Sequence, residues 1–237
     1  MKYLKLIIIM LICTSASAQV SKGALISVFG DRNLSDNPLD TKLYESIMKD
    51  SSFNLNPIVN KFDEAIRTIL LPQFPFTFIS KDEVVNADGY QDLQKLSRWP
   101  SNNWFTTSAD QYVSIAAFAL SEDTEAIKKS FDILPEGVDG VMIAFVSFNI
   151  YDAGGIGPLA KKKVYAYVNL KIFDKSGEKV FKLRERASSS DGVLAVGGFI
   201  TDLSKLTPMI ESASANLIAD METKLSKSLK KMAKDFE

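Results

Sequence analysis

Acidic and amide side chains gather in one short stretch near the N-terminus, where they could bind a cation. Asp31, Asn33, Asp36 and Asp40 lie close together in the sequence, and their oxygen atoms are the kind of ligand that Ca²⁺ and Mg²⁺ prefer. The stretch lacks the glycine of an EF-hand loop, and Lys42 stands where that loop has its bidentate glutamate. Asp and Asn are also common in ordinary loops. We therefore predict no metal site and keep the four residues as part of a candidate binding surface.

Aromatic residues form the second part of this candidate surface. Trp99 and Trp104 belong to a stretch that is rich in aromatic residues. Tyr165 and Tyr167 alternate along an expected strand, so they share one of its faces. Such rings could form a platform for a sugar or a peptide, or they could cover the second face of a sheet beneath a helix. The sequence leaves both interpretations open.

Catalytic chemistry is restricted because the chain contains no histidine and only one cysteine, Cys13. Ser-His-Asp triads, Cys-His pairs and zinc sites built from His and Cys are therefore excluded. Paired carboxylates and Ser-Lys chemistry are still allowed. Ser-x-x-Lys occurs at Ser46, Ser176 and Ser228, but without the companion motifs of Ser-Lys enzymes. We predict no catalytic residue and no cofactor.

The first 18 residues have the features of a cleavable signal peptide. A positively charged start precedes a short apolar run, and Ala16-Ser17-Ala18 provides a small-residue cleavage site. The run is too short to cross a bilayer as a helix, and no second run of about 20 apolar residues follows, so no transmembrane helix is expected. Lipidation at Cys13 is disfavoured because the bulky Ile12 precedes it. We expect cleavage after Ala18 and a periplasmic or secreted product.

The remaining residues, 19–237, are expected to form a single α/β (α+β) domain. Helical and strand patterns interleave early, and three strands follow one another late in the chain, the second of them alternating in period two. Gly154 to Gly157 joins two of these strands, which indicates a hairpin loop rather than a phosphate loop. A long amphipathic helix follows near Pro208. The expected fold is a mixed sheet with a C-terminal three-strand antiparallel meander and helices packed on it.

The order of these elements, together with three short motifs, resembles a group of bacterial envelope domains. The motifs are Phe76–Val84, Gly137–Val141 and the turn Asp174–Glu178. The resemblance is to the curli-secretion lipoprotein type and the penicillin-binding-protein activator type. It implies a non-enzymatic role, either in a secretion channel or in binding and activating envelope enzymes. The chain departs from those types because it lacks a good lipidation site, and its only candidate for a membrane-spanning insertion is 188–200. No functional residue is carried over.

These observations lead to an expected function and two alternatives. We expect an exported, non-enzymatic binding or assembly module of the cell envelope, with an envelope protein or a cell-wall component as its partner. The alternatives are a hydrolase that uses carboxylates or a divalent ion, and a subunit of an oligomeric secretion or envelope complex. Removal of the signal peptide lowers the net charge from −1 to about −3. The acidic balance and the lack of a basic stripe indicate that nucleic acid is not the partner.

Overall fold

The computed structural model describes residues 20–31, 34, 53–98, 106–118, 121–156, 159–196, 200 and 203–225. The strands are β1 (Lys22–Asp31), β2 (Thr77–Phe78), β3 (Thr106–Ser108), β4 (Ala117–Phe118), β5 (Ser121–Glu122), β6 (Gly140–Ile156), β7 (Leu159–Asp174), β8 (Lys179–Ser188) and β9 (Val193–Val196). The α-helices are α2 (Asn56–Ala65), α3 (Lys81–Val85), α4 (Leu93–Leu96), α5 (Thr124–Ile133) and α6 (Leu206–Asp220). Short turns of other helix types are η1 (Ile66–Leu70), η2 (Leu71–Gln73), η3 (Tyr90–Asp92), η4 (Leu203–Lys205) and η5 (Met221–Leu225).

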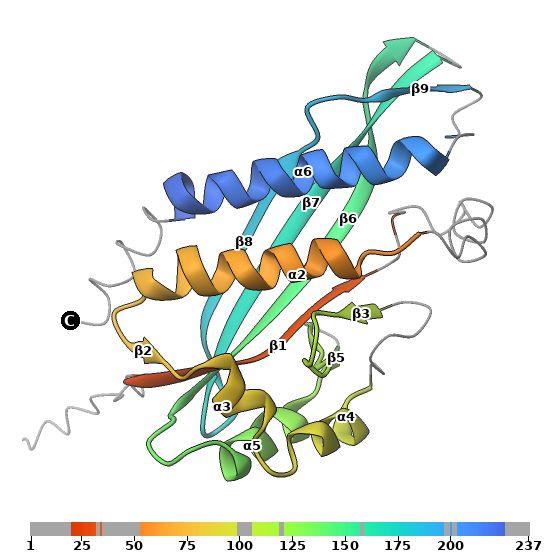
Figure 1. The fold of residues 1–237 in the computed structure, drawn as a ribbon. Helices are drawn as coiled ribbons and strands as arrows, with labels where there is room; N and C mark the ends of the chain where they lie inside the picture. The colour runs from red at the N-terminus through yellow and green to blue at the C-terminus, as the bar shows by residue number, and fades with distance from the viewer. Residues whose placement is uncertain are drawn as a thin grey trace, which may run out of the picture.

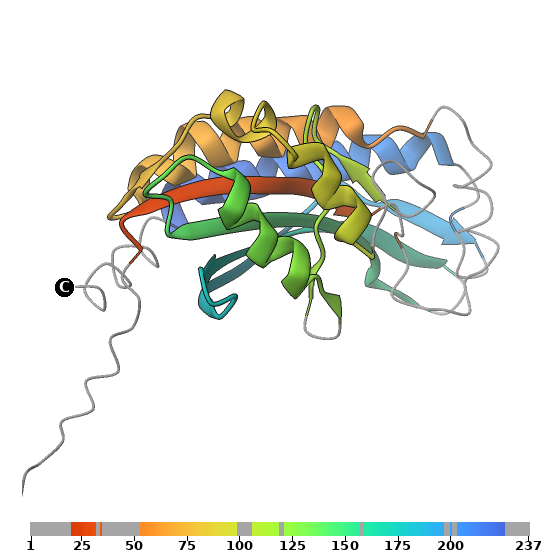
Figure 2. The same ribbon diagram turned by 90° about the horizontal axis from the view of Figure 1, so that it is seen from below.

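A mixed sheet with the strand order β2-β1-β6-β7-β8 forms the centre of the molecule (Figure 1). The strand β3 also pairs with β1, and β9 pairs with β7, whereas β4 and β5 form a separate hairpin. Helices α2 and α6 cover one face of the sheet, and α5 lies on the other side (Figure 2). This arrangement confirms the expected α+β class with a mixed sheet and packed helices.

The strand β1 is buried on both faces, which explains its continuous apolar sequence. It pairs in parallel with both β2 and β6, and parallel neighbours require long crossover connections that place helices on the sheet. A Cβ atom on Gly30 would lie 2.8 Å from the side chain of Val59 in α2. Because side chains alternate along a strand, Gly30 faces α2, while Phe29 and Asp31 face the opposite side.

The three consecutive strands β6, β7 and β8 form the expected antiparallel meander. The β6–β7 register runs from Gly140↔Asp174 to Ile156↔Leu159, and the β7–β8 register runs from Tyr165↔Ser188 to Phe173↔Lys179. In the turn between β7 and β8, the Oδ1 atom of Asp174 accepts hydrogen bonds from the backbone N–H groups of Ser176 and Glu178. Gly177 has a φ of 82°, a left-handed conformation that glycine adopts without strain.

The N-terminal part of β7, which precedes Tyr165, pairs with β9 instead of β8. In this pairing, Lys162 is opposite Val193. The segment 188–200 therefore contains a short strand that was not predicted as such. The connection between β8 and β9 passes very close to the backbone of β7, because a Cβ atom on Gly192 would lie 2.5 Å from the carbonyl oxygen of Lys162. Glycine is the residue that allows the backbone to come so close.

The helix α6 is the expected long C-terminal helix, and it packs against β7 and β8. Its buried side chains are Leu206, Met209, Ile210, Ala213, Ser214 and Leu217. The β7 residues that alternate with Tyr165 and Tyr167 point to the opposite face of the strand and are 0–1% exposed. They are Val164, Ala166, Val168, Leu170 and Ile172. One face of the meander is therefore part of the hydrophobic core. The residues that follow Leu225 lie outside the described part of the chain.

Asn56-Pro57 is a sequence typical of a helix start with Asn as the N-cap, but α2 begins at Asn56 itself. The N-cap residue is Leu55, and Pro57 lies in the first turn. The Asn56 side-chain amide donates instead to the carbonyl oxygen of Ser108 and to Asp110 Oδ1. Ser108 is the last residue of β3 and Asp110 follows it, so the Asn56 side chain bonds to this distant segment instead of forming a local cap.

Asp63, on the buried side of α2, links this helix to the start of α3. The Oδ1 atom of Asp63 lies 2.9 Å from Arg67 Nε, and its Oδ2 atom lies 2.9 Å from Lys81 Nζ. The Asp63 side chain is 4% exposed. This carboxylate is therefore a buried ion-pair centre between two helices.

Candidate functional site

Tyr165 and Tyr167 lie on the face of the meander opposite to α6, and three further residues complete one cluster with them. In the β6–β7 register, Tyr165 is opposite Asn149, two residues before Tyr151. In the β7–β8 register, Tyr167 is opposite Arg186. Directly opposed residues in an antiparallel pair point to the same side of the sheet. We call Tyr151, Tyr165, Tyr167, Arg184 and Arg186 the tyrosine–arginine face.

The rings of this face are in direct contact with one another. The centroids of Tyr151 and Tyr165 are 3.8 Å apart, and the two rings are stacked at 13° to each other. The Tyr165 and Tyr167 rings meet edge to face, with centroids 5.9 Å apart. The Tyr151 hydroxyl also forms a hydrogen bond with the hydroxyl of Ser188 on β8. The three tyrosines therefore form a continuous aromatic surface across β6 and β7.

Two arginines from β8 lie over these rings. The Arg186 Cζ atom is 4.6 Å from the Tyr165 centroid, and the Arg184 Cζ atom is 5.0 Å from the Tyr167 centroid. Arg186 Nη1 also donates a hydrogen bond of 3.3 Å to the Tyr167 hydroxyl, and this bond is the first cause of the raised pKa of the Arg186 guanidinium. Both arginines are exposed, whereas Tyr167 is 7% exposed. Guanidinium groups therefore lie over two of the three rings, those of Tyr165 and Tyr167.

The two arginines have no ion pair with any carboxylate in the described part of the chain. Lys182 lies two residues before Arg184 on β8, so its side chain is on the same face of the strand, and it is also exposed. Glu185 alternates with the arginines and is opposite the buried Val168, so it belongs to the α6 side of the sheet. Among the described residues, no carboxylate pairs with the arginines of the tyrosine–arginine face, which is positively charged on a protein whose overall charge is negative.

The other residues of the candidate surface are placed only in part. Asp31 lies at the end of β1, opposite Thr106 of β3, and on the same side of the sheet as the tyrosine–arginine face. Asn33, Asp36, Asp40, Trp99 and Trp104 lie outside the described residues. Tyr151, Arg184 and Arg186 were not predicted as site residues. The pattern Lys-x-Arg-x-Arg at 182–186 was the sequence signal for the two arginines, because its period of two places all three cations on one strand face.

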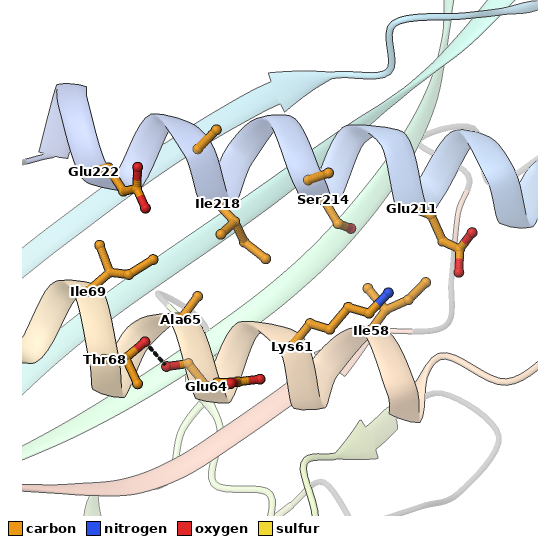
Figure 3. A pocket seen from close by; sticks show the side chains of 12 residues that line it. Ile58, Lys61, Glu64, Ala65, Thr68, Ile69, Glu211, Ser214, Ile218 and Glu222 are labelled. Atoms are coloured by element: carbon orange, nitrogen blue, oxygen red, sulfur yellow. Dashed lines mark hydrogen bonds between the residues drawn. The ribbon is translucent and has the colours of Figure 1, made fainter.

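A groove lies between α2 and α6 (Figure 3). Its volume is about 500 Å³, and it continues over η1 and η5. Ala65 and Ile69 point across the gap toward Ser214 and Ile218 in this view. The charged side chains in its lining are Lys61, Glu64, Glu211 and Glu222. This groove has an apolar floor and a mostly acidic border, so it differs in charge from the tyrosine–arginine face.

Within the described ranges, no group of three or more His, Cys, Asp or Glu side chains is arranged as a metal site would require. None of the helices described is both long and apolar enough to cross a membrane.

Comparisons with known proteins find only distant structural similarity. No family model and no curated protein sequence matches the chain. The hypothetical protein CT253 from Chlamydia trachomatis is 10% identical, with a TM-score of 0.41, and the match covers 89% of this chain and 98% of that one. A structure described as a neuraminyllactose-binding hemagglutinin homolog from Helicobacter pylori is also 10% identical, with a TM-score of 0.33 and coverage of 91% and 90%. Similarities of this size carry no inference about function.

Proposed function

We propose that the chain is an exported, non-enzymatic binding module of the cell envelope, and that it contacts its partner through the tyrosine–arginine face. The observation that carries this proposal is the pair Arg184 and Arg186, two exposed guanidinium groups held over tyrosine rings without an ion pair to a described carboxylate. A guanidinium group that stacks on a ring keeps its in-plane N–H donors available for a carboxylate or a phosphate. The face therefore suits a partner that presents anionic groups.

The proposal that the protein is exported is supported by the residues that follow the expected cleavage site. Val20 is 4% exposed, and its side chain occupies the space in which a Cβ atom on Gly140 would lie. The backbone N–H and the hydroxyl of Ser21 both donate to the carboxylate of Asp139. Cleavage after Ala18 would leave all of these contacts in place. The resemblance to envelope domains agrees with this proposal.

Affinity capture with matched variants tests the proposed binding surface. The mature wild-type protein, Arg184→Gln/Arg186→Gln and Lys61→Gln/Lys128→Gln are each immobilised and exposed to an envelope fraction of the source organism. The lysine variant removes the same charge from exposed positions on α2 and α5. We expect one defined partner to be retained by the wild type and the lysine variant, and about tenfold less of it by the arginine variant, because arginines are frequent binding hot spots.

Three outcomes would contradict the proposed function. The first is that the wild-type protein retains no specific component of the envelope. The second is that the arginine variant retains the partner as well as the wild type does. The third is that both variants lose it equally. In the last case, the overall charge rather than the tyrosine–arginine face would control retention.

A further inference from the structure

The strand β8 is the last strand in the order of the main sheet, and within the described part of the chain no strand pairs with its outer edge. It pairs with β7 on one side. On the other side, no residue in the described part of the chain forms a hydrogen bond with the backbone between Val180 and Ala187. An edge strand of this length presents a row of N–H and C=O groups that another extended segment can use. Strand addition at such an edge is an established way to bind a peptide.

The side chains of β8 define which segment fits this edge. Lys182, Arg184 and Arg186 occupy alternate positions, so their side chains emerge on one face about 6.8 Å apart along the strand. An added strand with acidic residues at alternate positions has the same spacing. Each of its carboxylates would lie beside one cation, as an oppositely charged cross-strand pair. Phe181, Leu183, Glu185 and Ala187 alternate with these cations and would be neighbours of the other face of the added strand.

A second copy of this chain does not fit the same edge. Antiparallel pairing of β8 with itself around Arg184 would place Arg184 opposite Arg184 and Lys182 opposite Arg186. Like charges directly opposite each other destabilise a strand pair, and exposed cations are one of the ways in which natural proteins protect an edge from association. The same cations would attract a strand that carries negative charges, so this edge would select an acidic partner over a second copy of the chain.

We propose that β8 accepts an added strand from an acidic protein segment that carries Asp or Glu at alternate positions. This inference rests on the proposed function, because it names the class of partner and the way in which it adjoins the tyrosine–arginine face. The backbone of the added strand pairs with β8, and its carboxylates contact Lys182, Arg184 and Arg186. The partner segment is thus recognised by its pattern of charges and by its ability to adopt an extended β conformation.

Synthetic peptides test this inference on the mature protein. The probe is an acetylated and amidated peptide of seven residues in which glutamate alternates with valine. One control peptide has the same composition with its glutamates adjacent, and a second has lysine in place of glutamate. Trigalacturonate tests for an acidic sugar that cannot add a strand. Binding is measured by titration, and pairing is measured by hydrogen exchange of the β8 amides.

We expect the alternating glutamate peptide to bind best and to slow exchange at alternate amides between Val180 and Ala187. Arg184→Glu/Arg186→Glu should weaken its binding by about tenfold or more, because attraction becomes repulsion at two cross-strand positions. The same variant should gain affinity for the lysine peptide, which also shows that the variant is folded. Arg184→Gln/Arg186→Gln should have an intermediate affinity for the glutamate peptide.

The inference would be overturned if the β8 amides show no added protection, if the clustered peptide binds equally well, or if the charge-reversed variant does not change its preference. Binding of trigalacturonate to the arginines without protection of β8 would also overturn strand addition, but it would leave the proposed binding face intact. Loss of both this binding and the envelope capture would contradict the proposed function as well.

Discussion

Ser80 and Glu83 form a reciprocal capping box at the start of α3, and this pair makes the local structure sensitive to acid. The Oε2 atom of Glu83 accepts hydrogen bonds of 2.8 Å from the backbone N–H and the hydroxyl of Ser80. In return, the Ser80 hydroxyl accepts from the backbone N–H of Glu83. The hydrogen bond from the Ser80 backbone is the first cause of the lowered pKa of Glu83.

We expect Glu83→Gln to lower the free energy of unfolding at pH 7 and to have a smaller effect at about pH 3, which lies below the ordinary pKa of a glutamate. Because the pKa is lowered in the folded state, the stabilisation is complete above the ordinary value of about 4.3 and is lost as the pH falls through the folded value. Urea unfolding of both proteins at the two pH values checks this, and Glu211→Gln controls for the loss of one surface charge. An equal difference at both pH values would contradict the assignment.

Single residues were predictable from the sequence where their partners are local. The capping box can be read from the sequence because Ser80 and Glu83 are three positions apart and the motif contains both members. The stack of Arg186 on Tyr165 was not predicted because the two residues belong to different strands. Their contact depends on the β7–β8 register, which hydrophobic periodicity alone does not determine.

At the scale of elements, the ion pairs of Asp63 are the link between α2 and α3. We expect Asp63→Asn to lower the free energy of unfolding by about 2 kcal/mol, because Arg67 and Lys81 would lose a charged, largely buried acceptor. Equilibrium unfolding in urea measures this change. Asp132→Asn is the matched control, since Asp132 is 65% exposed in its pair with Lys129 and exposed pairs contribute little. A control effect as large as that of Asp63→Asn would contradict this account.

Whole elements were predicted well where burial dominates and poorly where it does not. The apolar run of β1, the alternation of β7 and the stripe of α6 all reflect contacts with the core, and all three elements are present. The strand β9 was missed because it has four residues and contains Leu194, which is 71% exposed. Asn56 is a residue of α2 and not its N-cap; its side chain bonds to Ser108 and Asp110, and no sequence pattern reveals such distant partners.

At the scale of the whole molecule, the expected class of fold follows from the order of the elements, but the order of strands in the sheet does not. The sequence order places β1 and β6 far apart, whereas the structure makes them parallel neighbours. That choice depends on which strands bury most surface together, and several sheet orders satisfy the same periodicities.

The expected processing of the chain can be tested on the whole molecule. We expect full-length protein that is produced in a host with a Sec export pathway to be recovered from the periplasm or the medium with Gln19 as its first residue. Intact-mass measurement and N-terminal sequencing check this expectation. Recovery of a chain that still begins at Met1, or of a lipid-modified chain that begins at Cys13, would contradict it.

The parallel pairing of β1 with β6 also determines when the chain can fold. Ser21 and Asp139, which hydrogen-bond beside this pair, are 118 positions apart. Contacts of such high separation are slow to form because a long loop must close first. A chain that emerges N-terminus first therefore exposes β1 without its central neighbour until β6 has followed. A fragment that ends before β6 cannot complete the sheet, so the central pairing of β1 can form only after β6 has been synthesised.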